Sequence, residues 1–264
     1  MSIRSPQAIV LGLALSFSLT APVLADSAER RGYVAPAELA HKVEAFPAAP
    51  VAGSPEDLAD KAASARFRSL ENTERWLLAT THSAMLPPVG LRHFDCALGY
   101  RVDPAEAPTL TRLYTKLLFD ANGLAEQIKV KSPRLRPIGD DLERPSCERI
   151  NAAARQSSSY PSGSASLATA YGEALAVLVP EKAEAVRAAA HQVALSRLVC
   201  GMHYPTDVAV GVEVGKVAFG LASATPEFAE DLAAARLELA AAQAKGDTSP
   251  ACAAERSALA IPLP

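Results

Sequence analysis

Apolar residues recur every three to four positions along most of this chain, and no stretch alternates convincingly with the period of two that marks a strand. A period near 3.6 is typical of helices with one buried face. The pattern predicts helices over residues 55–66, 69–86, 90–98, 107–128, 164–178, 180–200, 206–222 and 226–244. Abundant alanine and few aromatic residues suit close helix packing. The expected fold class is therefore all-α, a single-domain helical bundle.

Residues that start or stop helices divide the chain into segments. Ser54 and Pro55, followed by two acidic residues, form a helix start, and Gly246 is expected to stop the last helix. Residues 26–54 are rich in Ala and Pro, which predicts an extended arm with at most a short helix over residues 36–43. We expect the helical domain at residues 55–245 and a C-terminal tail at 246–264. The irregular stretches, 129–163 and 201–205, carry the candidate chemistry.

Residues 1–25 have the composition of a secretory signal peptide. Arg4 is their only charge, small and apolar residues run from Ala8 to Leu19, and Val23 and Ala25 offer the small side chains that a signal peptidase reads. We predict cleavage after Ala25 and a periplasmic location; an uncleaved membrane anchor is the alternative. Beyond residue 25 the sequence holds no run of about 18 apolar residues, so membrane insertion of the mature chain is not expected.

Charge narrows the class of ligand. Removing Arg4 leaves 25 basic and 29 acidic residues, so the formal net charge moves from −3 to −4. This mild acidity speaks against nucleic acid or an anionic membrane as a partner. Against it, four cations gather in one short segment, namely Lys129, Lys131, Arg134 and Arg136. A local basic cluster in a mildly acidic chain indicates a small anionic ligand.

The basic segment is constrained by prolines. Pro133 and Pro137 prevent a continuous helix, so Lys129 and Arg136 leave the preceding helix on a loop and can turn into one pocket. An Arg side chain can bind two phosphate oxygens at once, whereas Lys acts as a point charge. The alternative is a solvated basic loop at a helix C-terminus, where cations are favoured in any case.

A second segment, Pro161-Ser162-Gly163-Ser164, leads into a predicted helix. Gly163 allows a tight turn and close approach to a ligand, and the helix N-terminus offers free N–H groups to an anion. Ser162 can add a hydroxyl donor. The alternative is an ordinary helix cap made by Ser162 or Ser164.

The third segment places His203 in a turn between two predicted helices, with Arg197 before it and Asp207 after it. A carboxylate four residues after a histidine can accept its Nδ1–H, which leaves Nε2 as a nucleophile. A purely structural histidine would not explain the accompanying Asp, the nearby Arg and two further anion-binding segments. The sequence has no metal-ligand cluster, so we expect no metal or cofactor and an activity insensitive to chelators.

In order and spacing these segments resemble the three-part signature of the phosphatidic acid phosphatase type 2 superfamily, and most closely the bacterial class A non-specific acid phosphatases. That signature reads Lys–six residues–Arg-Pro, then Pro-Ser-Gly-His, then Ser-Arg–five residues–His–three residues–Asp. The first and third elements match throughout, and the second matches in three of four positions, with Ser164 in place of the histidine. The resemblance covers roughly residues 55 to 235 and includes Asn72-Thr-Glu-Arg75.

The resemblance implies a bundle of the acid phosphatase and vanadium haloperoxidase type that hydrolyses small phosphate monoesters. It implies that His203 attacks phosphorus to form a phosphohistidine, and that Asp207 orients and charges His203. The phosphate would be held by five residues, Lys129, Arg136, Ser162, Gly163 and Arg197.

Ser164 is the departure, because the family uses the histidine at that place as the general acid. A hydroxyl is too weak an acid for this role, and general acid catalysis is typically worth about a hundredfold to ten-thousandfold, mainly for poor leaving groups. Three interpretations follow: a specialised or slowed phosphatase in which Ser164 holds a water or a phosphate oxygen, another acid (with His82, His93 and His191 as the candidate histidines), or a degenerate phosphate-binding protein. Retention of the other site groups favours the first.

Two other activities are alternatives to a phosphatase acting on small esters. A vanadate-dependent haloperoxidase would also rely on the missing histidine, and a lipid phosphatase would need membrane helices. A homo-oligomer is left open.

Four cysteines in an exported chain allow two disulfides and three pairings. Cys147 and Cys200 lie in segments that resemble the acid phosphatases, so the resemblance favours their pairing. Cys96 would then pair with Cys252 and clasp the tail. Free buried thiols are the alternative.

Overall fold

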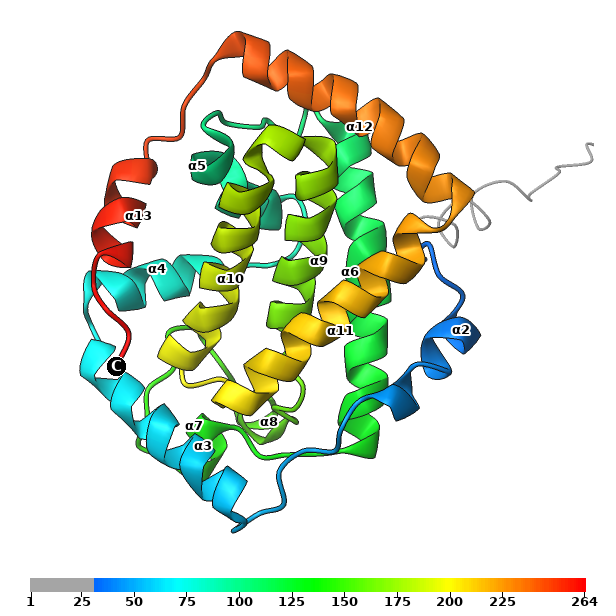
Figure 1. The fold of residues 1–264 in the computed structure, drawn as a ribbon. Coiled ribbons are helices and arrows are strands. Elements are labelled where there is room, and N and C mark those ends of the chain that lie inside the picture. The colour runs from blue at the N-terminus through cyan, green and yellow to red at the C-terminus, as the bar shows by residue number, and fades with distance from the viewer. Residues whose placement is uncertain (1–30) are drawn as a thin grey trace, which may run out of the picture. The chain divides into compact units, whose positions relative to one another are not determined.

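The computed structural model describes residues 31–264. The predicted signal peptide and its cleavage site after Ala25 lie outside the described residues. Over the described range the chain is helical and contains no strand, which confirms the predicted all-α class (Figure 1).

The longer helices are α3 (Pro55–Arg66), α4 (Glu74–His82), α6 (Pro108–Lys131), α9 (Gly163–Leu178), α10 (Ala183–Val199), α11 (Pro205–Ser223) and α12 (Pro226–Lys245). The shorter ones are α2 (Pro36–Ala40), α5 (Asp95–Leu98), α7 (Pro137–Asp140), α8 (Ala152–Gln156) and α13 (Cys252–Leu259). Short 3-10 segments, η1 (Val43–Ala45), η2 (Phe67–Leu70), η3 (Val89–Phe94) and η4 (Pro180–Lys182), complete the order.

Helices α3, α6, α9, α11 and α12 lie within a few residues of the predicted ranges. The predicted helix over 69–86 is wrong as one element, because Asn72 adopts a left-handed φ of 62° and breaks it. Thr73 then caps α4 by accepting a hydrogen bond from the Trp76 amide at 3.4 Å. Similarly, the predicted helix over 90–98 is the 3-10 segment η3 followed by the single turn α5.

Three helices were not predicted, and each is short or distant from the main bundle. Helices α7 and α8 lie within the stretch expected to be irregular, residues 129–163. Helix α13 lies within the predicted C-terminal tail and packs against α4. Figure 1 shows α13 in red beside α4.

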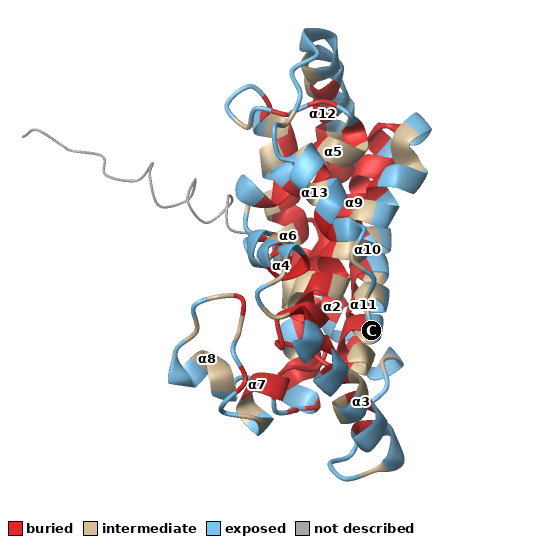
Figure 2. Cartoon of the chain, turned by 90° about the vertical axis from the view of Figure 1, so that its left-hand side faces the viewer, coloured by how far each residue is buried: buried red, intermediate tan, exposed pale blue. Residues whose placement is uncertain are grey.

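Helix α9 is the central element, packed against α6, α10 and α11. Its small residues bring these neighbours close, and Tyr114 of α6 stacks on Tyr171 of α9 with ring centroids 4.1 Å apart. Figure 2 shows the buried residues on the inward faces of these helices, with exposed residues on the outside. The apolar periodicity read from the sequence therefore corresponds to burial around α9.

Two glycines set the contact between α11 and α9. A Cβ at Gly211 would lie 2.5 Å from the Ser162 carbonyl oxygen, and one at Gly215 would overlap the Ser166 carbonyl. Since a side chain at either place would force the helices apart, these glycines permit the second and third turns of α11 to lie against the start of α9.

Two disulfides join distant parts of the chain, Cys96–Cys252 and Cys147–Cys200, with Cα–Cα distances of 5.4 Å and 4.8 Å. The pairing favoured by the resemblance is confirmed, and free thiols are wrong for the four cysteines, all of which lie in the described range. The first disulfide ties α13 to α5, and the second ties the loop before α8 to the C-terminal end of α10.

No single helix among residues 31–264 is long and apolar enough to cross a membrane. Helices α11 and α12 meet that test of length and composition only as a pair, and they are bent by 95° at their junction.

Candidate active site

The three candidate segments meet at one end of the bundle, where α6 and α10 end and α9 and α11 begin. Backbone hydrogen bonds hold them together: the Ser162 amide donates to the Asp207 carbonyl at 2.9 Å, and the Ser159 amide donates to the Arg134 carbonyl at 2.8 Å. Gly201, with a φ of 68°, reverses the chain between α10 and α11. The fold therefore brings together residues that lie more than 70 positions apart in the sequence.

His203 is at the centre of this arrangement and is only 2% exposed. Its Nδ1 lies 2.7 Å from the Ser159 carbonyl oxygen, which can only accept, so Nδ1 carries the proton. Its Nε2 lies 3.1 Å from Nη1 of Arg136, which can only donate. Both contacts assign the same neutral tautomer, with a free electron pair on Nε2.

Burial lowers the pKa of His203 well below its usual value, and the positive charges of Arg136, Arg197 and Lys129 lower this pKa further. The positive charges of all three cations therefore act on the imidazole. A histidine held neutral and oriented by a carbonyl is suited to nucleophilic attack at acidic pH.

The three cations are buried, with exposures of 9% for Lys129, 9% for Arg136 and 3% for Arg197. Burial lowers the pKa of Lys129, and burial together with the charge of Arg197 lowers the pKa of Arg136 to about 10. Buried like charges repel one another, so their proximity is costly unless an anion joins them. The cluster is accordingly built to receive a multiply charged anion.

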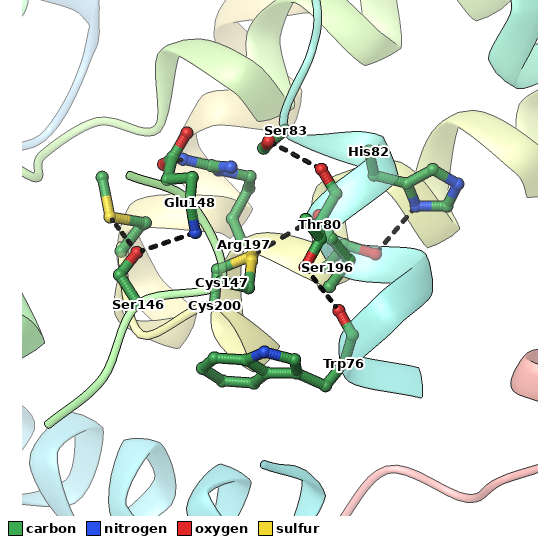
Figure 3. The surroundings of a disulfide bond; sticks show 12 residues. Trp76, Thr80, His82, Ser83, Ser146, Cys147, Glu148, Ser196, Arg197 and Cys200 are labelled. Atoms are coloured by element: carbon green, nitrogen blue, oxygen red, sulfur yellow. Dashed lines mark hydrogen bonds and ion pairs between the residues drawn. A yellow bond between two sulfur atoms is a disulfide. The ribbon is translucent and has the colours of Figure 1, made fainter. Parts of the chain in front are cut away.

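Arg197 gives the most direct sign of such an anion. Its Nη2 donates to Glu148 at 2.6 Å, but its Nε and Nη1 are buried and have no partner among the described residues. Figure 3 shows Arg197 and Glu148 beside the Cys147–Cys200 disulfide. Because buried donors are nearly always paired, the two free donors are most simply explained as partners of a ligand oxygen.

The predicted contact between Asp207 and His203 is wrong. Oδ2 of Asp207 is 3.9 Å from Nδ1 of His203, and the Ser159 carbonyl accepts that proton instead. The reason is that both carboxylate oxygens are occupied: Oδ2 accepts from the Tyr204 amide at 2.8 Å, and Oδ1 accepts from Arg134 at 2.9 Å. Asp207 therefore caps α11 and lies near His203 without a hydrogen bond to it.

Arg134 joins Asp207 to α3 through a buried ionic cluster. It donates to Asp60 at 2.7 Å and to Asp57 at 2.8 Å, and its guanidinium stacks on the Tyr204 ring at 4.1 Å. Burial alone would lower the pKa of Arg134, but its carboxylate partners raise this pKa above the usual value. The sequence interpretation treated Arg134 only as one member of the basic cluster.

The Ser162–Ser164 segment begins α9. The Ser162 hydroxyl accepts from the Ala165 amide at 3.3 Å, so the capping alternative describes its observed contact. Nζ of Lys129 lies 3.4 Å from the position that a Cβ on Gly163 would take, which places this cation at the helix N-terminus. Ser164 is partly exposed, and its hydroxyl has no partner within residues 31–264.

The candidate histidines His82, His93 and His191 do not contact His203 or its three cations. His82 bonds to Ser196 at 2.9 Å, as Figure 3 shows, His93 bonds to the Ala84 carbonyl at 2.9 Å, and His191 is exposed. His82 and His93 instead line a separate cavity of about 710 Å³ between α4 and α13. The interpretation in which one of these histidines replaces the missing acid thus finds no supporting contact.

Two of the residues around the cations could not be assigned from the sequence. Glu148 lies 49 positions before Arg197. Glu126 lies three positions before Lys129 in α6 and accepts a hydrogen bond from it at 2.9 Å. The spacing of Glu126 was the available signal, since residues three apart share a helix face. Across the described range, no group of three or more His, Cys, Asp or Glu side chains is placed to hold a metal ion.

Comparison with known proteins agrees with this geometry. Residues 111–229, which include Lys129, His203 and Asp207, match the PAP2 superfamily. An acid phosphatase of Zymomonas mobilis subsp. mobilis is 29% identical over 75% of each chain, and a non-specific acid phosphatase of Providencia stuartii is 29% identical over 74% of this chain and 79% of its own. A non-specific acid phosphatase of Salmonella typhimurium is 28% identical over 68% of this chain and 72% of its own. This chain therefore carries a PAP2 superfamily domain and is a homologue of the bacterial non-specific acid phosphatases.

Proposed function

We propose that this protein is an exported acid phosphatase that hydrolyses small phosphate monoesters through a phosphohistidine intermediate on His203. The observation that carries the proposal is the arrangement of three buried cations around a neutral imidazole whose Nε2 carries no proton. The names of the relatives in Zymomonas, Providencia and Salmonella support it.

Phosphate would bind among Lys129, Arg136 and Arg197. The two free donors of Arg197 would pair with its oxygens, and the positive end of α9 at Gly163 would face them. The Ser162 hydroxyl keeps its hydrogen available, because its observed contact uses the oxygen as acceptor. Preorganised charge of this kind is typically the largest contribution to phosphoryl transfer.

Nε2 of His203 then attacks phosphorus, and the bond to the ester oxygen breaks. The imidazole becomes positively charged, and the nearby carboxylate of Asp207 stabilises that charge across 3.9 Å. Water attacks the phosphohistidine in the second step, the P–N bond breaks, and phosphate leaves with His203 neutral again.

Export is supported by two disulfides, which persist in oxidising compartments. The Cys147–Cys200 disulfide holds the loop before α8 to the end of α10, near Arg197. The Cys96–Cys252 disulfide holds α13 to α5. We accordingly propose the periplasm as the place of action.

The test compares the purified chain with His203→Ala on an aryl phosphate and an alkyl phosphate. We expect hydrolysis of the aryl ester by the wild type and its loss in His203→Ala, with a ³²P-labelled enzyme intermediate trapped only in the wild type. Binding of phosphate or vanadate without turnover of either ester would instead indicate a degenerate, phosphate-binding relative. Vanadate-dependent bromination without phosphatase activity would indicate a haloperoxidase.

A further inference from the structure

The side of the site on which the leaving group lies can be inferred from the burial of the site residues. His203 and the three cations are all less than 10% exposed, so the phosphate must enter with its bulky group toward solvent. In-line attack by Nε2 places the leaving oxygen on the side opposite His203. A group that protonates the leaving oxygen must therefore lie at the open side of the site.

Two carboxyl groups contact the cation cluster within the described residues. Glu148 bonds to Arg197 beside the Cys147–Cys200 disulfide, and its side chain is 24% exposed. Glu126 bonds to Lys129 at 2.9 Å, and its side chain is 56% exposed. A proton donor must regain its proton from a water molecule in every turnover, and water reaches the more exposed Glu126 more readily.

Lys129 also fixes where Glu126 lies. Its Nζ is 3.4 Å from the place of a Cβ on Gly163, so the Glu126–Lys129 pair faces the first turn of α9, next to Ser164. Oδ1 of Asn122 lies at the same distance from that place. The Ser164 hydroxyl cannot supply a proton at working pH, whereas a carboxyl group can.

We propose that Glu126 is the proton donor to the leaving group, an inference that rests on the proposed phosphatase function. Phosphate oxygens take over Lys129 when substrate binds, which releases the Glu126 carboxyl group from this ion pair so that it can face the leaving oxygen. As Nε2 of His203 bonds to phosphorus and the P–O ester bond breaks, the ester oxygen takes the proton of Glu126 and leaves as an alcohol. The Glu126 carboxylate then takes a proton from the water that cleaves the P–N bond.

The test measures kcat for a series of esters from 4-nitrophenyl phosphate to glycerol 2-phosphate in the wild type, Glu126→Gln and Glu148→Gln. Gln keeps an acceptor for Lys129 but has no proton to give. We expect Glu126→Gln to lose about a hundredfold or more on the alkyl ester and far less on the 4-nitrophenyl ester. Glu148→Gln is the matched control, since it changes the other glutamate–cation pair, and it should affect both esters alike. Adding Ser164→His to Glu126→Gln should restore alkyl phosphate turnover.

Equal losses on both esters in Glu126→Gln, or no loss, would overturn the inference while the proposed function stood. A selective alkyl loss in Glu148→Gln instead would assign the role to Glu148 and likewise overturn it. Turnover of neither ester by the wild type would overturn the proposed function, and this inference with it.

Discussion

Arg134 and Asp207 form an ion pair of 2.9 Å in which the two side chains are 6% and 0% exposed. This contact explains why Asp207 does not bond to His203: Arg134 holds one carboxylate oxygen, and the Tyr204 amide holds the other. The same guanidinium bonds to Asp57 and Asp60, so α3 is fastened to the turn that carries His203. Arg134 is thus a positioning residue rather than a ligand for phosphate.

Replacing Arg134 with Ala should destabilise the protein strongly. The change leaves three buried carboxylates without their shared cation, and breaking a buried pair by removing one partner costs about 3–5 kcal/mol. Urea unfolding of Arg134→Ala at neutral pH measures this loss.

Lys131→Ala is the matched control for that change. Lys131 belongs to the same basic segment but pairs with Glu44 on the surface, so its loss should cost no more than about 1 kcal/mol. Equal destabilisation by the two substitutions would contradict the role given to Arg134.

His203 should remain neutral, with its proton on Nδ1, at mildly acidic pH. The reason is that burial and three nearby cations lower its pKa well below the usual 6.5. We expect ¹⁵N NMR of the ligand-free protein to show the Nδ1–H tautomer without titration between about pH 7 and 5. A His203→Ala spectrum assigns the signal, and protonation near pH 6.5 would refute the described environment.

Removing the Cys96–Cys252 disulfide should lower stability without impairing turnover. It closes a sequence separation of 156 residues, and loss of a native disulfide typically costs about 2–5 kcal/mol. The double variant Cys96→Ser, Cys252→Ser should therefore unfold at a lower urea concentration and keep the wild-type kcat/KM for an aryl phosphate. The pair Cys147→Ser and Cys200→Ser is the comparison, because Cys147 precedes Glu148 and Cys200 lies between Arg197 and His203. This second pair should lower both stability and kcat/KM.

Asp95→Asn should stabilise the protein at neutral pH but not at acidic pH. Burial raises the pKa of Asp95 from 3.8 to about 6, although the Val102 amide and two arginines oppose this. The folded state therefore binds a proton more readily than the unfolded chain, and wild-type stability from this group rises as pH falls from about 7 toward 4. Asn keeps an acceptor for the Val102 amide, which bonds to Asp95 at 3.2 Å. The difference in unfolding free energy between variant and wild type should shrink over that range; a constant difference would contradict the assignment.

Helices that bury a regular apolar stripe could be predicted closely, because periodicity is a local property of the sequence. Helix α6 begins at Pro108 and α11 at Pro205, within a residue of the ranges expected. The break at Asn72 was missed because propensity over residues 69–86 favoured continuation, although Asn followed by Thr73 is a helix-start signal. Helix α13 was missed because its position depends on the Cys96–Cys252 disulfide and on α4, which are distant in sequence.

At the candidate site, the residue types and spacing were enough to bring Lys129, Arg136, Arg197 and His203 together. Which acceptor each donor uses could not be predicted in the same way. The spacing of His203 and Asp207 permits a hydrogen bond, but the competing partners Arg134 and Ser159 come from other segments and decide the outcome. Glu148 could not be predicted for the same reason, because its contact with Arg197 joins residues that are distant in the sequence.

The glycine contacts between α11 and α9 have a consequence for engineering this protein. Gly211 and Gly215 carry no chemistry, yet they let α11 lie directly against Ser162 and Ser166 at the start of α9. A methyl group there would push the start of α9 away from α11 while leaving every charged residue in place. A library screened for higher activity should therefore conserve these two positions as strictly as the histidine itself.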